Sequence, residues 1–236
     1  MRRLVGLLRD LMPALLIGPL LALVPTSADA ATVRLGGITV RLRPGTSQVV
    51  TADRTTGHHA RVRLWSLRDG RWTVVAATAD GRIGYGGLSR PAQRHQGDGT
   101  TPTGTFDLTF AFGTHARKPG WRMPFHRIRT GDYWVGDNSS AHYNRLRTKA
   151  QGGFRWWLPQ SDDDASEHLI HYRSQYEYAF ATSFNARQVR ERGFAIFLHV
   201  NGRGATAGCV SAPRSFLRLL YRRLSAQRRP VIAIGS

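Results

Sequence analysis

The sequence predicts a mainly β fold with one or two packed helices. Short apolar or alternating segments recur along the chain and are separated by turns rich in Gly, Asp and Pro, which is a pattern typical of strands. One segment near the C-terminus instead has apolar residues at helical spacing. The chain carries no internal repeat and no coiled-coil pattern, so we expect one β-rich domain with at most a small N-terminal extension.

Several segments have the pattern of strands. Residues 61–65 alternate between polar and apolar, and residues 72–75 follow them after Asp69-Gly70, a dipeptide that favours a tight hairpin turn. Asp80-Gly81 indicates another turn, and the apolar run 194–200 has the length of a buried strand. The other expected strands are residues 49–50, 105–112, 176–182 and 231–234.

The expected helix covers residues 216–224, where apolar side chains recur at a helical period. Arginines gather toward its C-terminal end, where positive charge interacts favourably with the helix dipole. Ser211 is a suitable N-cap, and Pro213 is tolerated in the first turn. The spacing therefore predicts that this helix begins close to Ser211.

Residues 1–30 have the features of a cleaved export signal. They begin with arginines, continue with an apolar segment and end with Ala28-Asp29-Ala30, a small-x-small cleavage pattern. A membrane anchor is the alternative, but a spanning helix needs about 20 apolar residues, and this segment is shorter and interrupted by prolines. We expect a secreted or cell-wall protein that begins at Ala31 and has no stable membrane span.

The chain is strongly basic, with 34 Lys and Arg against 15 Asp and Glu and a net charge of +19. Residues 1–30 contain three arginines and two aspartates, so the expected mature chain carries +18. Such a charge predicts adhesion to polyanions. Because the chain is expected to be exported and has no nucleic-acid motif, we expect anionic cell-wall polymers as partners, and no nucleic acid.

Cys209 is the only cysteine, which in an exported protein indicates a reactive thiol or an intermolecular disulfide. A position at a helix start would lower its pKa, and His199 is placed to accept its proton. The backbone amides of Ala207 and Gly208 are candidates for an oxyanion hole. The alternative is that Cys209 is a small buried apolar residue and that His199 has only a structural role.

Two segments resemble the L,D-transpeptidase (YkuD-type) catalytic domain. They are Thr206–Ser211 ("TAGCVS"), with Ile196–His199 upstream, and Asp98–Phe106 ("DGTTPTGTF"). The resemblance implies a β-sandwich-like fold, with Cys209 as the nucleophile toward peptidoglycan stem peptides and His199 as the general base. The commonest family form has a histidine at the position of Ala207 and an Arg or Asn at that of Ser211, so the substrate preference is left open.

The resemblance also suggests a division of the chain. We expect a signal peptide over 1–30, a β-rich extension over 31–83 and the catalytic domain over 84–236. In the irregular middle of the chain, His142, Tyr143 and His168 are candidates for binding substrate. A zinc site at residues 167–171 would need more ligands, so we expect neither a metal nor another cofactor.

These observations predict an exported cysteine acyltransferase that carries out L,D-transpeptidation through an acyl-enzyme on Cys209. If water replaces the acceptor amine, the same site acts as an L,D-carboxypeptidase or endopeptidase. The remaining alternative is a non-catalytic, basic module that binds the cell wall. Thiol reactivity separates the enzymes from the binding module, because a binding module needs no reactive cysteine.

Overall fold

The computed structural model describes residues 31–236, so the expected signal segment, residues 1–30, lies outside the described residues. The described chain is mainly β with one α-helix, which confirms the predicted fold class. The helix is α1 (Arg214–Arg223), and short 3-10 helices cover Lys149–Gln151, Leu169–Tyr172, Gln175–Glu177 and Ala226–Arg228. The strands are β1 (Thr32–Leu35), β2 (Ile38–Arg41), β3 (Gln48–Arg54), β4 (His59–Arg68), β5 (Arg71–Arg82), β6 (Leu88–Ser89), β7 (Thr101–Pro102), β8 (Gly104–Gly113), β9 (Phe125–Arg127), β10 (Asp132–Trp134), β11 (Leu146–Thr148), β12 (Glu167–His168), β13 (Tyr178–Thr182), β14 (Phe197–Val200), β15 (Val210–Ala212) and β16 (Val231–Gly235).

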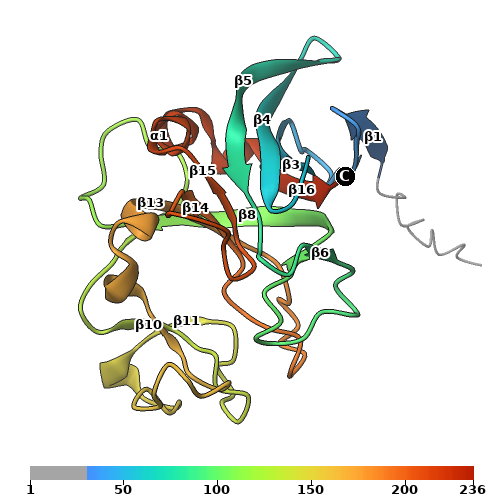
Figure 1. The fold of residues 1–236 in the computed structure, drawn as a ribbon. Helices are drawn as coiled ribbons and strands as arrows, with labels where there is room; N and C mark the ends of the chain where they lie inside the picture. Colours follow the sequence, from blue (N-terminus) through green and yellow to red (C-terminus); the bar gives the residue numbers. More distant parts are fainter. Residues whose placement is uncertain (1–30) are drawn as a thin grey trace, which may run out of the picture.

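The main sheet closes on itself. Its strands follow the order β13-β14-β15-β5-β4-β3-β16-β8-β9, and β13 also pairs with β8, which joins the two ends into a barrel-like sandwich. Most pairs are antiparallel, whereas β14–β15, β16–β3 and β8–β9 are parallel. Figure 1 shows β8 crossing the middle of the molecule, with the β4–β5 hairpin on one side and β10–β11 on the other.

Helix α1 packs its apolar face against the main core. Phe216, Leu217, Leu220 and Tyr221 are buried, and they contact apolar side chains of the closed sheet. The Tyr221 hydroxyl also donates to the carbonyl oxygen of Phe112 over 2.6 Å, so it ties the helix to β8. The predicted helix is confirmed; it begins at Arg214, two residues before the expected apolar segment and three residues after Ser211.

The predicted cap of this helix is wrong. Ser211 lies within β15, is buried, and its hydroxyl donates to Asn201 Oδ1 over 2.7 Å. The residue before the helix is Pro213, which makes no side-chain cap. Cys209 therefore precedes a strand, and the helix begins five residues after it, at Arg214.

The two predicted turns in the β4–β5 region had different outcomes. Asp69 and Gly70 have φ values of 48° and 72°, as required for the expected tight hairpin turn. Asp80-Gly81 is not a turn, because β5 continues through it to Arg82. A Cβ at Gly81 would lie 2.7 Å from the carbonyl oxygen of Ala60 on β4, so the glycine allows close approach of the two strands.

The expected boundary between extension and catalytic domain, after residue 83, does not correspond to a structural boundary. Strands β3, β4 and β5 belong to the closed sheet, where β3 pairs with β16 and β5 with β15. Only the β1–β2 hairpin forms a separate small sheet before residue 48, and it packs Leu35, Ile38 and Val40 onto the outside of β3 and β16. None of the helices within residues 31–236 is long and apolar enough to cross a membrane.

Candidate active site

The candidate active site lies where β14 and β15 run side by side. Their parallel register pairs Leu198 with Val210 and His199 with Ser211, which places Cys209, just before β15, beside Phe197. Cys209 and His199 both line a cavity of about 520 Å³. The structure therefore brings together the two residues predicted to carry out catalysis. Other residues that line this cavity include Arg94, Glu167, Tyr176, Ala195 and Ala207.

The thiol of Cys209 is buried and neutral. Only 8% of the residue is exposed, its sulfur donates to the carbonyl oxygen of Ala195 over 3.1 Å, and it accepts from the Phe197 amide over 3.3 Å. Burial, with a smaller contribution from Glu167, raises the pKa of Cys209 to about 12. The predicted lowering of this pKa is wrong, since it depended on a helix start that lies elsewhere.

His199 is held as a neutral imidazole. It is 6% exposed, and burial lowers its pKa to about 4. Its Nδ1 lies 2.8 Å from the carbonyl oxygen of Val200, which can only accept, so Nδ1 carries the ring proton. Nε2 is then unprotonated. The ring also packs edge-to-face against Tyr176, with the centroids 5.4 Å apart. His199 is thereby prepared to accept a proton.

Within residues 31–236 of this structure, no hydrogen bond joins Cys209 to His199; the thiol proton points to Ala195 instead. Ala195 has a left-handed backbone, with φ of 52°, and its amide donates to Asn144 Oδ1 over 3.2 Å. Proton transfer from Cys209 to His199 would therefore require the thiol to leave the Ala195 carbonyl oxygen. Catalytic hydrogen bonds commonly form only when substrate is bound.

The segment of residues 206–209 is hydrogen-bonded to the second motif of the sequence, residues 98–106. Thr101 Oγ1 accepts from the Gly84 amide over 2.7 Å and donates to the Cys209 carbonyl oxygen over 3.4 Å. Thr206 Oγ1 donates to the same carbonyl over 2.6 Å. A Cβ at Gly84 would lie 2.0 Å from the carbonyl oxygen of Gly99, so the segments pack backbone to backbone. The "DGTTPTGTF" segment therefore supports the cysteine directly.

The predicted oxyanion donors lie beside Cys209. Gly208 has φ of 136°, and its amide donates to Thr206 Oγ1 over 3.2 Å, so it would have to exchange this acceptor for a substrate oxygen. Ala207 lines the cavity. Their role in holding an oxyanion stays a prediction.

Arg94 is a site residue that the sequence analysis missed. It is 4% exposed, and its guanidinium donates to the carbonyl oxygens of Thr100 and Arg192 over 2.8 and 2.9 Å. It also lies against Gly208, where a Cβ would come within 2.9 Å of its Nη2. Burial lowers the pKa of Arg94, and its positive charge in turn favours the thiolate of Cys209. The only available signal was its place just before the glycine-rich motif.

Glu167 is a second missed residue. It lines the cavity, and its carboxylate accepts a hydrogen bond from the hydroxyl of Tyr176, the residue that packs on His199. Burial raises the pKa of Glu167 to about 7. The neighbouring His168 stacks on Tyr133 and reaches the Thr130 carbonyl oxygen over 2.5 Å. In residues 31–236 no group of three metal-binding side chains occurs.

The three residues predicted to bind substrate do not line the cavity. Tyr143 is fully buried behind it, donates to Gln96 Oε1 over 2.5 Å and accepts from the Gly193 amide over 2.9 Å. Because Gln96 and Gly193 line the cavity, Tyr143 supports its wall. His142 lies beside Gly153, and His168 is held by the contacts described above. A binding role for His142, Tyr143 and His168 therefore gains no support from the cavity.

Replacing Glu167 by Gln is expected to increase thiol alkylation at alkaline pH. In the native protein Glu167 ionises as the pH rises through about 7, and its negative charge then opposes ionisation of Cys209. Below that pH both proteins carry a neutral side chain and should react alike. Above it we expect the variant to react roughly three- to tenfold faster, since one pKa unit changes the thiolate fraction about tenfold. Iodoacetamide labelling followed by mass spectrometry across this pH range measures the difference; equal rates at all pH values would contradict it.

The structure is thus that of a β protein with a closed sheet, in which a buried cysteine and a histidine line one cavity. The family model of the L,D-transpeptidase catalytic domain (YkuD) matches residues 47–232. The chain belongs to this family, which confirms the resemblance seen in the sequence. The match begins before β3, so it includes β3, β4 and β5 of the expected extension but not β1 and β2.

Among solved structures, the chain is similar to the helical cell shape determining protein Pgp2 of Campylobacter jejuni, at 13% identity and a TM-score of 0.41, over 80% of this chain and 47% of that one. Bd1075 of Bdellovibrio bacteriovorus is 14% identical, with a TM-score of 0.38, over 80% of this chain and 48% of that one. An L,D-transpeptidase from Mycobacterium smegmatis is 14% identical, with a TM-score of 0.36, over 87% of this chain and 66% of that one. The chain thus spans about half the length of the first two proteins. A comparison with curated proteins found no match.

Proposed function

We propose that this protein is an exported cysteine acyltransferase that acts on peptidoglycan stem peptides by L,D-transpeptidation. The observation that carries the proposal is that His199, on β14, and Cys209, just before the neighbouring β15, line one cavity, with His199 Nε2 free of its proton. The features of residues 1–30 support export, and the net charge of the chain supports retention at anionic cell-wall polymers.

In the proposed reaction the substrate carbonyl enters the cavity, and the Cys209 side chain turns from Ala195 toward His199. Nε2 takes the thiol proton as the sulfur attacks the carbonyl carbon, which forms an oxyanion intermediate. The imidazolium then gives this proton to the leaving amine, the carbon–nitrogen bond breaks, and a thioester remains on Cys209. An acceptor amine attacks the thioester; His199 takes its proton and returns it to the departing sulfur.

This is a general-base mechanism with a neutral resting pair. The pKa of Cys209, about 12, and that of His199, about 4, mean that neither group is charged near neutral pH. A thiolate–imidazolium pair would require the opposite order of the two values. Arg94 supplies a fixed positive charge near the sulfur, which favours the thiolate as it forms. The amides of Ala207 and Gly208 are the groups proposed to hold the developing oxyanion.

The proposal is tested with a defined tetrapeptide muropeptide, incubated with and without an acceptor amine. We expect the mass of the cross-linked or exchanged product only when the amine is present, together with a thioester on Cys209 early in the reaction. Release of the terminal residue without incorporation of the amine would instead assign the site to an L,D-carboxypeptidase. No change in the peptide, with the protein retained on isolated cell walls, would indicate a binding module.

A further inference from the structure

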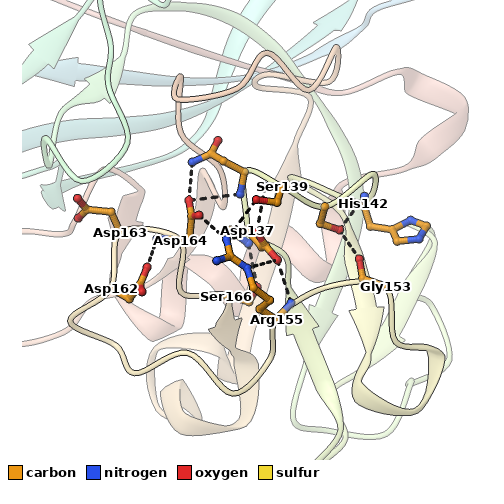
Figure 2. Close-up of polar contacts among 12 residues, drawn as sticks. Asp137, Ser139, His142, Gly153, Arg155, Asp162, Asp163, Asp164 and Ser166 are labelled. Carbon is orange, nitrogen blue, oxygen red and sulfur yellow. Dashed lines mark hydrogen bonds and ion pairs between the residues drawn. The ribbon is translucent and has the colours of Figure 1, made fainter.

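A second groove of about 390 Å³ lies beside the catalytic cavity and shares no lining residue with it. One side is formed by Asp137, Ser139 and Ser140, and the other by residues 152–157, which include Trp156 and Trp157. The Ser140 hydroxyl donates to the Gly153 carbonyl oxygen over 2.6 Å, which ties the two sides together. Figure 2 shows the polar network around Asp137 and Arg155 next to this contact. The proposed mechanism uses none of these residues.

The aromatic side of the groove presents an exposed indole to solvent. Trp157 exposes 62% of its surface, which is unusual for so large an apolar side chain. Its ring stands at 90° to that of Trp156, with the centroids 5.7 Å apart. Trp156 is in turn covered by Lys149, whose Nζ lies 3.5 Å from the ring centroid. The geometry leaves Trp157 free for a flat, weakly polar partner.

On the polar side of the groove, the positive charge of Arg155 is compensated by neighbouring carboxylates. The Arg155 guanidinium donates to Asp137 over 2.6 and 3.1 Å and reaches Asp164 over 2.5 Å. Figure 2 shows this guanidinium between the two carboxylates. Two carboxylates face this one guanidinium, so the cluster repels a phosphate or a free carboxylate. Ser139 Oγ makes only a long 3.4 Å contact with Arg155, so it can bind a hydroxyl or an amide.

The groove and the catalytic cavity share a common wall. Asp164, the partner of Arg155, lies between Asp163 and Ala165, which both line the cavity. Gln96, another cavity residue, donates through Nε2 to the carbonyl oxygen of Gly136, over 2.9 Å, directly before Asp137. A ligand with one part in the cavity can therefore extend a second part toward the groove.

We propose that this groove is a saccharide subsite for the N-acetylated aminosugar chain that carries the stem peptide. A pyranose ring presents an apolar C–H face, which suits the Trp157 indole, and neutral hydroxyl and amide groups, which suit the charge-compensated side. The inference rests on the proposed function, because the saccharide and the stem peptide belong to one substrate. Trp157 would then determine specificity for glycan-linked over free peptide.

The first experiment measures binding of the N-acetylglucosamine tetramer to the full chain by calorimetry. We expect a dissociation constant of about 1 mM or tighter, weakened at least about tenfold by Trp157→Ala and less by Trp157→Phe, which keeps an aromatic ring. Val74→Ala, which trims an exposed side chain on β5 outside the groove, serves as the matched control and should bind like the native protein. No binding of the tetramer, or equal binding by Trp157→Ala and the native protein, would overturn the proposal.

The second experiment compares a free tetrapeptide with the same peptide attached to its disaccharide. For Trp157→Ala we expect an unchanged kcat on both, an unchanged KM on the free peptide and a KM raised about tenfold or more on the glycan-linked one. An equal change on both substrates would overturn the saccharide proposal. If neither substrate reacts in the native protein, the proposed function fails, whereas the tetramer titration still decides whether the groove binds saccharide.

Discussion

Cys209→Ala is expected to abolish turnover of the tetrapeptide muropeptide, with a loss of about 10⁴-fold or more, as is usual when a covalent nucleophile is removed. The substitution deletes the only thiol in the chain, so no other cysteine can form the acyl-enzyme. Product mass measurement under saturating substrate gives the rate, and the thioester mass should be missing at all times.

A stability measurement on Cys209→Ala serves as the control, because it shows whether the variant still folds. Alanine removes a buried atom and the contacts to Ala195 and Phe197, which should cost about 1–2 kcal/mol of unfolding free energy. The far-ultraviolet spectrum should be unchanged, and tetramer binding at the second groove should remain. A Cys209→Ala protein that folds and retains activity within tenfold of the native rate would contradict the proposed nucleophile.

His199→Gln is expected to slow acylation by roughly 10²- to 10⁴-fold, the usual contribution of a general base. Glutamine keeps a polar side chain that can donate to the Val200 carbonyl oxygen, but it cannot take up a proton near neutral pH. The effect should therefore appear in the rate of thioester formation, with little loss of stability. Single-turnover mass spectrometry measures this rate directly.

The pH profile gives a second measure of His199. The neutral imidazole is the active form, and its pKa lies at about 4, so activity should persist below pH 6 and fall as the pH drops through about 4. An ordinary histidine would instead lose activity near its usual pKa of about 6.5. The acid limb should disappear in His199→Gln. An acid limb near 6.5 in the native protein, or one unchanged in the variant, would contradict the assignment.

The closed sheet was only partly predictable from local pattern. The alternation in residues 61–65 and the turn at Asp69-Gly70 indicated the β4–β5 hairpin, because both signals act over a few residues. Asp80-Gly81 was misread as a turn, since its conformation follows from the approach of β4 and not from its own preference. The early strands were assigned to an extension because their pairing with β15 and β16 joins segments far apart in the chain.

The candidate site was also only partly predictable from the sequence. The solitary Cys209, the upstream His199 and two short motifs were sufficient to predict the family and the reacting pair, and the structure places both residues in one cavity. Arg94 and Glu167 gave no comparable signal. Arg94 comes from a loop and Glu167 from the small sheet β11-β10-β12, and both reach the cavity only in the folded chain.

The sequence by itself determined the fold class, the family and the two residues proposed to react. Only the tertiary structure decided the resting charge of that pair. Ser211 continues a strand instead of capping the helix, so Cys209 lacks the helix end that was expected to stabilise its thiolate. Burial then keeps both the thiol and His199 neutral. The physical reason is that desolvation depends on which side chains surround a group, and those side chains come from distant parts of the chain.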